Sequence, residues 1–318
     1  MAAILKDALK PNLVQNLEGG GALIHCGPFA NVAHGNNSVL ADRLALKLAD
    51  YVVTESGFGS ECGAEKLFDI KCRVAGLRPA AAVVVCSVRA LKLHGGAAID
   101  PRDAATWQRP DPEAVARGAA NLAKHVENVR LFGLPALVAI NRFASDSPAE
   151  IEAVAVAARA AGAAAAVPVE VYSRGGEGGV ELAEAVVRAT GTPAEFSPLY
   201  PLDAGIEAKI ETIARRVYGA AGVSYSEDAK RTLEFCRREG LAGLPICMAK
   251  THLSLSHDPK LLGRPEGFTL PITEVRVAAG AGYIYPLAGN ILTMPGLPAV
   301  PAAVGIDLDD DGLVQGLI

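Results

Sequence analysis

Short apolar segments alternate with longer amphipathic stretches over roughly the first 190 residues of the chain. The apolar segments are predicted to be buried strands and comprise residues 22–25, 51–54, 82–87, 136–140 and 167–171. The amphipathic stretches are predicted helices and comprise residues 38–49, 61–75, 113–131, 148–161 and 180–189. The clearest helix start lies at Ser147, with Pro148 at the first helical position and Glu150 placed to complete a capping box. This alternation is typical of βαβ crossovers and predicts an α/β fold, a parallel sheet flanked by helices.

The pattern changes after Pro193, where a Pro-rich link begins. The elements predicted beyond it are helices at residues 204–218 and 226–239 and strand-like pieces at 245–248 and 273–278. Loops rich in Gly and Pro separate the strand-like pieces. We therefore predict two domains, an α/β domain over residues 1–200 and a smaller α+β domain over residues 201–318.

Composition and charge exclude two classes of partner. Half of the 318 residues are apolar and 20% are charged, with a formal net charge of −5, so there is no basic field to hold a nucleic acid. The longest apolar run, residues 79–88, is far shorter than the roughly 20 residues that cross a bilayer. The first residues do not form a secretory signal pattern. We expect a cytoplasmic protein with neither nucleic-acid nor membrane partners.

The cysteines give no sign of a metal centre or a disulfide framework. The chain has six, and they show neither a CxxC pair nor a Cys/His ligand spacing. We expect reduced, mostly buried thiols and no metal site. Near the C-terminal end, Lys250 lies close to His252, His257 and Asp258. These residues suggest an acid/base or phosphate-binding cluster, and their spacing fits no metal template.

The residues that follow each predicted strand are the first candidates for a ligand site, because ligands of open α/β sheets bind beyond the carboxyl ends of strands. His34 lies in a Gly- and Asn-rich loop and is either a ligand contact or an ordinary hydrogen-bonded loop histidine. Glu55 opens a Gly-rich run that differs from a dinucleotide fingerprint by one residue, which favours a tight turn lining a cleft over an NAD site. Arg89 and Lys92 precede two glycines and form either a phosphate or carboxylate pocket or a solvated basic loop.

Two aromatic residues follow the last two predicted strands. Phe143 comes just after Asn141 in a polar loop, and Tyr172 precedes Gly175 and Gly176, which open a Gly-rich anion nest. An aromatic ring among polar loop residues is well placed to stack on a flat ligand. The pair therefore suggests a planar heterocycle, and packing under a loop is the alternative.

The same residues resemble the formate–tetrahydrofolate ligase family. The resemblance runs from about residue 5 to residue 318 and rests on long motifs in the family's order. These are GPFANVAHG at 27–35, the run at 54–73, VRALKLHGG at 88–96, GGEG at 175–178, CMAKT at 247–251 and the run at 279–298. The resemblance implies a partial P-loop NTPase-like α/β domain followed by the smaller domain.

The resemblance also implies an activity and its substrates. Family members are ATP-dependent ligases that convert formate, ATP (with Mg) and tetrahydrofolate into 10-formyltetrahydrofolate, ADP and phosphate through formyl phosphate, without a bound prosthetic group. It implies that Phe143 and Tyr172 sandwich the pterin, although Tyr172 stands where a Trp is usual, so a weaker stack is expected. The family's P-loop lysine and other phosphate-binding residues lie upstream of the matched region, so the catalytic residues are unknown.

No GxxxxGK[ST] run and no Gly-Lys pair occurs in the 318 residues. Two interpretations follow. The favoured one is a fragment or split subunit, inactive alone and completed by an N-terminal P-loop chain. The other is a non-catalytic protein that binds folate or nucleotide. We also expect a homo-oligomer, because a sheet that lacks its neighbouring segment exposes apolar surface.

Overall fold

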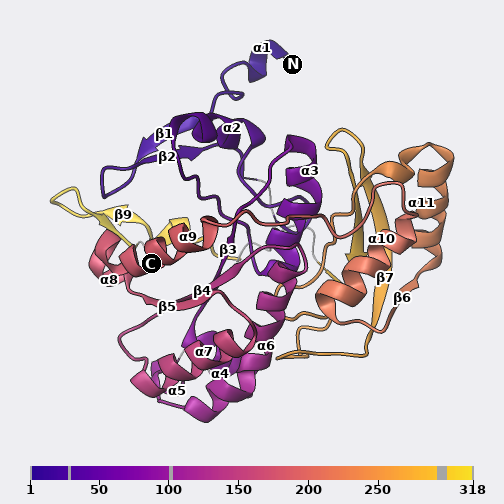
Figure 1. Cartoon of the computed structure of the whole chain (residues 1–318). Coiled ribbons are helices and arrows are strands. Elements are labelled where there is room, and N and C mark those ends of the chain that lie inside the picture. Colours follow the sequence, from indigo (N-terminus) through magenta and orange to yellow (C-terminus); the bar gives the residue numbers. More distant parts are fainter. Residues whose placement is uncertain (1, 28–29, 100–102, 292–298, 317–318) are drawn as a thin grey trace.

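A parallel sheet forms the centre of the N-terminal part of the molecule (Figure 1). The structure is a computed structural model and describes residues 2–27, 30–99, 103–291 and 299–316. The sheet has the order β3-β4-β5, with β3 at Ala82–Cys86, β4 at Ala136–Asn141 and β5 at Ala165–Val169. All three strands were predicted, and the α/β fold class is confirmed. The central strand β4 is buried along almost its whole length, as expected for a parallel strand covered on both faces.

Helices cover the two faces of this sheet. The helices concerned are α4 (Val88–His94), α6 (Pro112–Arg130), α7 (Pro148–Ala160) and α9 (Val180–Thr190). Leu137 of β4 packs with Val167 and Ala185 on the α9 side. Its neighbours Val138 and Ile140 point the other way, into the main core with α6 and α7. The alternation along one strand thus builds two separate apolar layers.

A second sheet follows in the C-terminal part, with the order β6-β7-β8. Its strands are β6 (Gly222–Tyr225), β7 (Thr269–Ala278) and β8 (Tyr283–Ala288), and β6 pairs with β7 in parallel while β7 and β8 are antiparallel. The accompanying helical segments are α10 (Ile206–Thr212), a π-helical turn at Ile213–Tyr218, and α11 (Glu227–Arg238). The predicted strand at 245–248 is only a pair of isolated bridges from Ile246 and Ala249 to β8.

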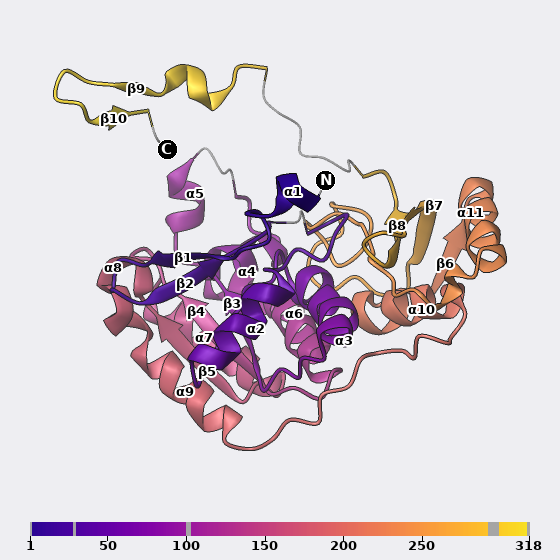
Figure 2. The same cartoon turned by 90° about the horizontal axis from the view of Figure 1, so that it is seen from above.

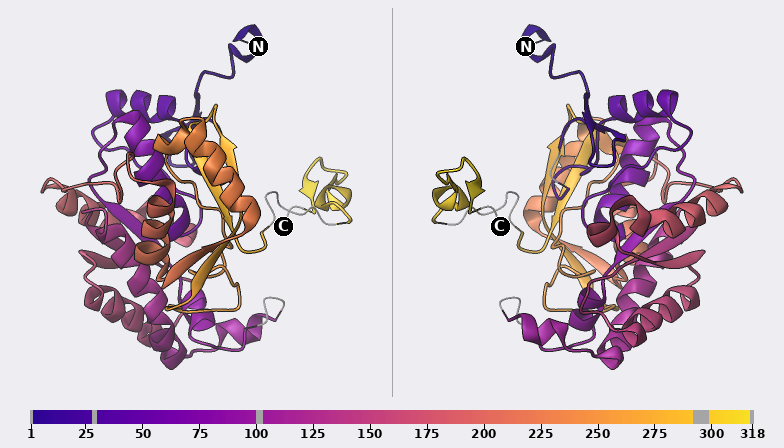
Figure 3. Two further views of the ribbon diagram at one scale, coloured as in Figure 1. Left: turned by 90° about the vertical axis from the view of Figure 1, so that its right-hand side faces the viewer. Right: turned by 90° about the vertical axis from the view of Figure 1, so that its left-hand side faces the viewer.

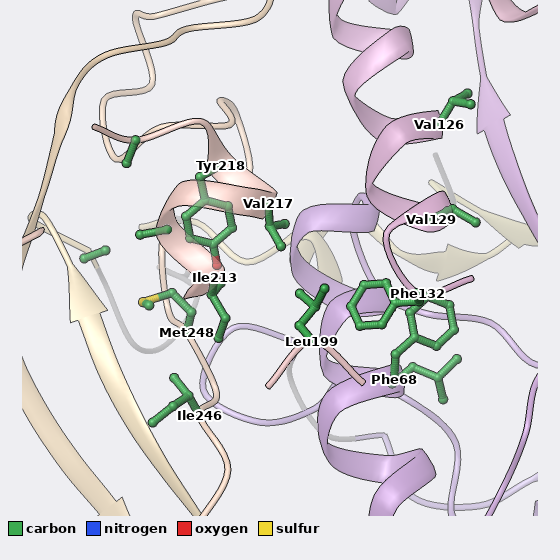
Figure 4. Close-up of a cluster of buried hydrophobic side chains, with 14 of the residues drawn as sticks. Phe68, Val126, Val129, Phe132, Leu199, Ile213, Val217, Tyr218, Ile246 and Met248 are labelled. Carbon is green, nitrogen blue, oxygen red and sulfur yellow. The ribbon is translucent and has the colours of Figure 1, made fainter. Parts of the chain in front are cut away.

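One buried apolar cluster joins the two parts (Figure 4). Phe68 packs its ring 4.7 Å from that of Phe132, at the end of α6. Leu199 lies between these rings and the side chains around Tyr218, which belong to the second part. The division at residue 200 remains a prediction.

Smaller elements lie at the two ends of the described chain. Two antiparallel hairpins are formed, one by β1 (Asn12–Gln15) with β2 (Gly21–Ile24) and one by β9 (Asp307–Leu308) with β10 (Val314–Gln315). The short helices outside the sheets are α1 (Ala2–Leu5), α2 (Val39–Leu48), α5 (Ala104–Gln108) and α8 (Val171–Arg174). The views in Figure 3 show α1 and the β9–β10 hairpin outside the two main sheets. None of the helices within the described ranges is long and apolar enough to cross a membrane.

Three sequence expectations are wrong at the level of local structure. Residues 51–54 do not form a strand; Tyr51 and Val53 are exposed and pair with no neighbouring strand among the described residues. Residues 22–25 supply β2 of an exposed hairpin, because the turn at residues 16–20 folds them back on β1 rather than into the parallel sheet. Residues 88–96 are mostly helix α4, which begins because Ser87 accepts a hydrogen bond from the Ala90 amide as an N-cap.

A helical segment with unusually many buried charges runs from Ser60 to Ala75. It consists of π-helical turns at Ser60–Ala64 and Leu67–Lys71 and ends in α3 (Cys72–Ala75). Glu65 and Asp69 are fully buried one turn apart. Burial first, and then the Asp69 carboxylate, raise the pKa of Glu65 well above its usual range. Both carboxyl oxygens of Glu65 and Oδ2 of Asp69 are buried without a hydrogen-bond partner among the described residues, so the site favours the uncharged form of Glu65.

We expect this pair to make stability fall on the alkaline side. A carboxyl with a raised pKa in the folded state contributes stability below its unfolded pKa, and that contribution is lost as pH rises through the folded pKa. Glu65→Gln keeps a neutral donor at the site, so its free energy of unfolding should fall less than the parent's between pH 5.5 and 8.5. Urea unfolding at both pH values measures this. Glu181→Gln, on the exposed face of α9, is the control, and equal pH slopes for Glu65→Gln and the parent would contradict the raised pKa of Glu65.

Candidate active site

The carboxyl ends of β3, β4 and β5 bring most of the predicted site residues to one edge of the sheet. Strands β4 and β5 pair Asn141 with Val169, and the Arg142 amide donates to the Val169 carbonyl at 3.1 Å. Phe143 and Tyr172 therefore follow neighbouring strands at the same end of the sheet. Arg89 follows β3 in the first turn of α4. This is the edge at which parallel α/β sheets bind ligands.

Phe143 is held at the start of a tight turn. Its amide donates to Asp146 Oδ2 at 2.9 Å, and the Asp146 amide donates back to the Phe143 carbonyl at 3.0 Å. Burial raises the pKa of the Asp146 carboxyl, while the Phe143 amide acts in the opposite direction. The backbone of Phe143 is thus fixed, and 39% of its surface remains exposed.

Arg89 lies against two aromatic rings. Its guanidinium carbon is 3.8 Å from the centroid of Trp107 and 4.9 Å from that of Phe143. Trp107 is the only tryptophan of the chain and comes from α5. Sequence reasoning found Arg89 but not Trp107, whose segment shows no strand end or glycine-rich turn.

Lys92, one turn further along α4, is buried rather than open to a ligand. Its Nζ lies 2.6 Å from Glu150 Oε1 and donates to the carbonyls of Trp107 at 3.3 Å and Arg109 at 2.9 Å. Glu150 also accepts from the Asp111 amide at 2.8 Å and closes the predicted capping box with Ser147. The hydrogen bonds from Lys92, Asp111 and Ser147 outweigh burial and lower the pKa of Glu150 to about 2.

Tyr172 lies on α8, beyond the end of β5, with its side chain completely exposed. The predicted strand extended to residue 171, but β5 ends at Val169. The glycine nest after α8 is occupied by the chain itself, since Glu18 Oε1 accepts from the Gly176 amide at 2.8 Å. A side chain at Gly175, whose φ is +59°, would collide with this carboxylate. Figure 2 shows the β1–β2 hairpin that carries Glu18 reaching towards α8.

The remaining predicted residues gather around the helical segment that starts at Ser60. Lys250 is buried, with Nζ 3.5 Å from Glu61 Oε1, and donates to the Thr251 and Ser254 carbonyls. His34 is half-buried, and burial, followed by Lys71 and Lys66, lowers its pKa. Glu55 is exposed in the turn before this segment.

This second group contains polar residues that the sequence analysis did not single out. His125 of α6 has Nδ1 2.8 Å from Ser60 Oγ and 3.5 Å from Glu61 Oε2. Burial is the largest of the influences that lower the pKa of His125. Glu61 Oε2 is buried without a hydrogen-bond partner among the described residues. Only the approach of helix α6 to residue 60 reveals the cluster, because His125 occupies an ordinary helical position in the sequence.

Comparisons with known proteins identify the same family that the sequence motifs resemble. The formate–tetrahydrofolate ligase family model matches residues 1–318. The formate–tetrahydrofolate ligase of Roseiflexus castenholzii is 56% identical over 324 residues, covering 100% of this chain and 57% of the relative. Those of Symbiobacterium thermophilum and Thermus thermophilus are 54% and 51% identical, each covering 100% of this chain and 56% and 57% of the relative, respectively. The chain thus spans just over half the length of these relatives.

We expect the buried Lys92–Glu150 pair to be essential for stability. Removing one partner of a buried ion pair leaves the other charge unpaired and costs roughly 3–5 kcal/mol, so Glu150→Gln should lower the free energy of unfolding by about that amount at pH 7. Because the pKa of Glu150 is lowered in the folded state, the pair contributes its full stability above pH 4.5, the usual pKa of glutamate. That stability is lost as the pH falls towards 2.

Chemical denaturation of parent and variant across pH 2–7 measures both effects. The matched control is Glu152→Gln on the same helix, which breaks an exposed pair with Arg159 at 2.7 Å and should cost at most about 1 kcal/mol. A cost for Glu150→Gln no larger than that of the control would show that the buried pair is dispensable.

Proposed function

Since the chain belongs to the formate–tetrahydrofolate ligase family, we propose that it supplies the folate-binding side of an ATP-dependent ligase. The complete reaction joins formate to tetrahydrofolate, giving 10-formyltetrahydrofolate, ADP and phosphate through formyl phosphate. The observation that carries the proposal is the placement of two exposed aromatic rings, Phe143 and Tyr172, after neighbouring parallel strands.

The surroundings of the two rings suit a pterin. Phe143 and Tyr172 come after adjacent strands, whose backbones are about 4.8 Å apart, so both side chains are within reach of one flat ligand beyond the strand ends. Asn141, the last residue of β4, is partly exposed. Arg142 and Glu170 pair at 3.4 Å and stay partly exposed, so donors and acceptors are available for the edge of the heterocycle.

The phosphoryl side is proposed to come from another segment. The 318 residues contain no GxxxxGK[ST] run, and both lysines predicted for the pocket, Lys92 and Lys250, are buried among protein acceptors. Phosphoryl transfer depends on placing charge around the γ-phosphate. We infer that a P-loop segment outside these residues binds ATP with its Mg, and that the chain alone is inactive.

The face around β3 is a suitable docking surface for that segment. Strand β3 ends the sheet order β3-β4-β5, so one of its edges is unpaired, and Val83 and Val85 on it are 39% and 69% exposed. Helix α2 also carries exposed apolar side chains, which are Leu40, Leu44, Leu46 and Leu48. Open edges and apolar patches favour association. A second copy of the chain is the other occupant that this surface fits, and the homo-oligomer and the cytoplasmic location remain predictions.

The folate proposal predicts opposite effects of two substitutions at one position. Stacking is worth about 0.5–1.5 kcal/mol beyond area burial, so Tyr172→Ala should weaken tetrahydrofolate binding several-fold. Tyr172→Trp should hold or improve it, because the larger ring covers more of the pterin. Calorimetric titration measures both. Equal affinity in the parent and both variants would remove the sandwich from the proposal.

The proposal also predicts that activity requires a second segment. Purified chain, free of host ligase, should form no 10-formyltetrahydrofolate from formate, ATP and tetrahydrofolate, because it has no phosphate cradle. Adding the P-loop-containing N-terminal part of a relative's ligase should produce turnover, and Val85→Glu should prevent this without unfolding the chain.

The outcomes separate the two interpretations of the chain. Turnover by the chain alone would refute the division of labour. Tight folate binding with no turnover, both by the chain alone and after addition of the N-terminal part, would favour the non-catalytic folate-binding protein. Val156→Glu, an exposed position on α7 at the other face of the sheet, is the matched control for the docking variant.

A further inference from the structure

We propose that Arg89 and Trp107 are positioning residues that hold Phe143 in the orientation required for stacking. The Arg89 guanidinium carbon lies over both rings, 3.8 Å from the centroid of Trp107 and 4.9 Å from that of Phe143. The inference rests on the proposed folate site and adds to it a support for one wall. Trp107 belongs to none of the motifs that carry the family resemblance.

The contact is favourable because of the charge distribution of an aromatic ring. The face of the ring is electron-rich, so a guanidinium stacked on it is attracted electrostatically, and the planar shape of arginine permits contact on both of its own faces. Arg89 therefore restrains the Phe143 ring, which is 39% exposed and would otherwise rotate about its side-chain bonds. The positive charge of Arg89 also draws the electron density of the Phe143 ring towards it. This favours an electron-rich ligand ring on the opposite face of Phe143.

Arg89 is itself held in place by the helix that carries it. It lies in the first turn of α4, whose neighbouring side chains Val88 and Leu91 are almost completely buried. Ser87 caps this helix through the Ala90 amide at 3.2 Å. The side chain therefore projects from a fixed backbone.

Trp107 is held by backbone contacts that do not depend on its ring. Lys92 Nζ donates to the Trp107 carbonyl at 3.3 Å and to the Arg109 carbonyl at 2.9 Å. The backbone is also held four residues further on, where the Asp111 amide donates to Glu150 Oε1 at 2.8 Å. Substitutions of the Trp107 side chain keep these backbone acceptors, so the ring can be changed without releasing the segment.

The experiment compares tetrahydrofolate binding by the full chain and four variants, measured by anaerobic calorimetry. Arg89→Met removes the charge and the plane, Trp107→Leu removes the outer ring, and Trp107→Phe restores a ring. Arg238→Met is the matched control, because it removes a guanidinium 5.6 Å from the ring of Phe235 on α11. From the usual strength of exposed cation–π contacts, Arg89→Met and Trp107→Leu should each weaken binding about two- to fivefold. Trp107→Phe and Arg238→Met should leave the affinity close to that of the parent.

A second readout follows the stack without a ligand. Because Trp107 is the only tryptophan, its near-ultraviolet circular dichroism reports its own surroundings. Arg89→Met should reduce the tryptophan signal in the near-ultraviolet circular dichroism spectrum, while the midpoint of thermal unfolding stays at the parent's value. A merely destabilising substitution would shift the midpoint instead.

The results distinguish the two levels of the proposal. A parent chain that does not bind tetrahydrofolate would overturn the proposed function and this inference together. A parent that binds, with Arg89→Met and Trp107→Leu binding equally well, would overturn the positioning role alone. Failure of Trp107→Phe to restore binding would also count against it, because the ring would then not be the relevant group.

Discussion

A buried lysine requires a complete set of acceptors, and the need to satisfy Lys92 organises the edge of the sheet. Its Nζ gathers the Glu150 carboxylate and two carbonyls of the α5 segment, so that α4, α5 and α7 meet at one atom. Desolvating two charges is costly unless good geometry and further hydrogen bonds compensate, and Glu150 meets this condition with the Asp111 amide and the Ser147 cap. The exposed aromatic groups depend on this buried arrangement, because it fixes the backbone from which Trp107 projects and the helix that follows the Phe143 turn.

Periodicity predicted the parts of the fold in which burial is simple. Strands β3, β4 and β5 and helices α6 and α7 agree with the predicted segments to within a few residues, and the capping box at Ser147 is present. Local sequence could not show that residues 51–54 lack a strand partner, because pairing is a property of the tertiary fold. The same holds for α4, in which the cations and glycines of a presumed loop obscured a helix that Ser87 starts.

The site residues divide by burial in a way that residue type alone does not reveal. Arg89, Phe143 and Tyr172 keep exposed surface at the strand ends. In contrast, Lys92 and Lys250 are buried and form ion pairs with Glu150 and Glu61. Lys92 before two glycines and Lys250 near two histidines each suggested a phosphate site, and only the distances to Glu150 and Glu61 show that both lysines are paired within the protein. The two aromatic residues do keep exposed surface, Phe143 in a turn and Tyr172 on α8, and their role in ligand stacking remains a prediction.

The β1–β2 hairpin has a consequence for how the molecule opens. Its strands are largely exposed, and its tip is joined to the glycine nest through the Glu18–Gly176 hydrogen bond, which spans 158 positions of sequence. Such a long loop closure is entropically unfavourable and is supported here by little buried area. The hairpin therefore belongs to the low-stability end of the local unfolding equilibria. We therefore expect its amides to exchange hydrogen through openings that leave the β3-β4-β5 sheet intact, each of which would break the Glu18–Gly176 hydrogen bond and uncover the nest.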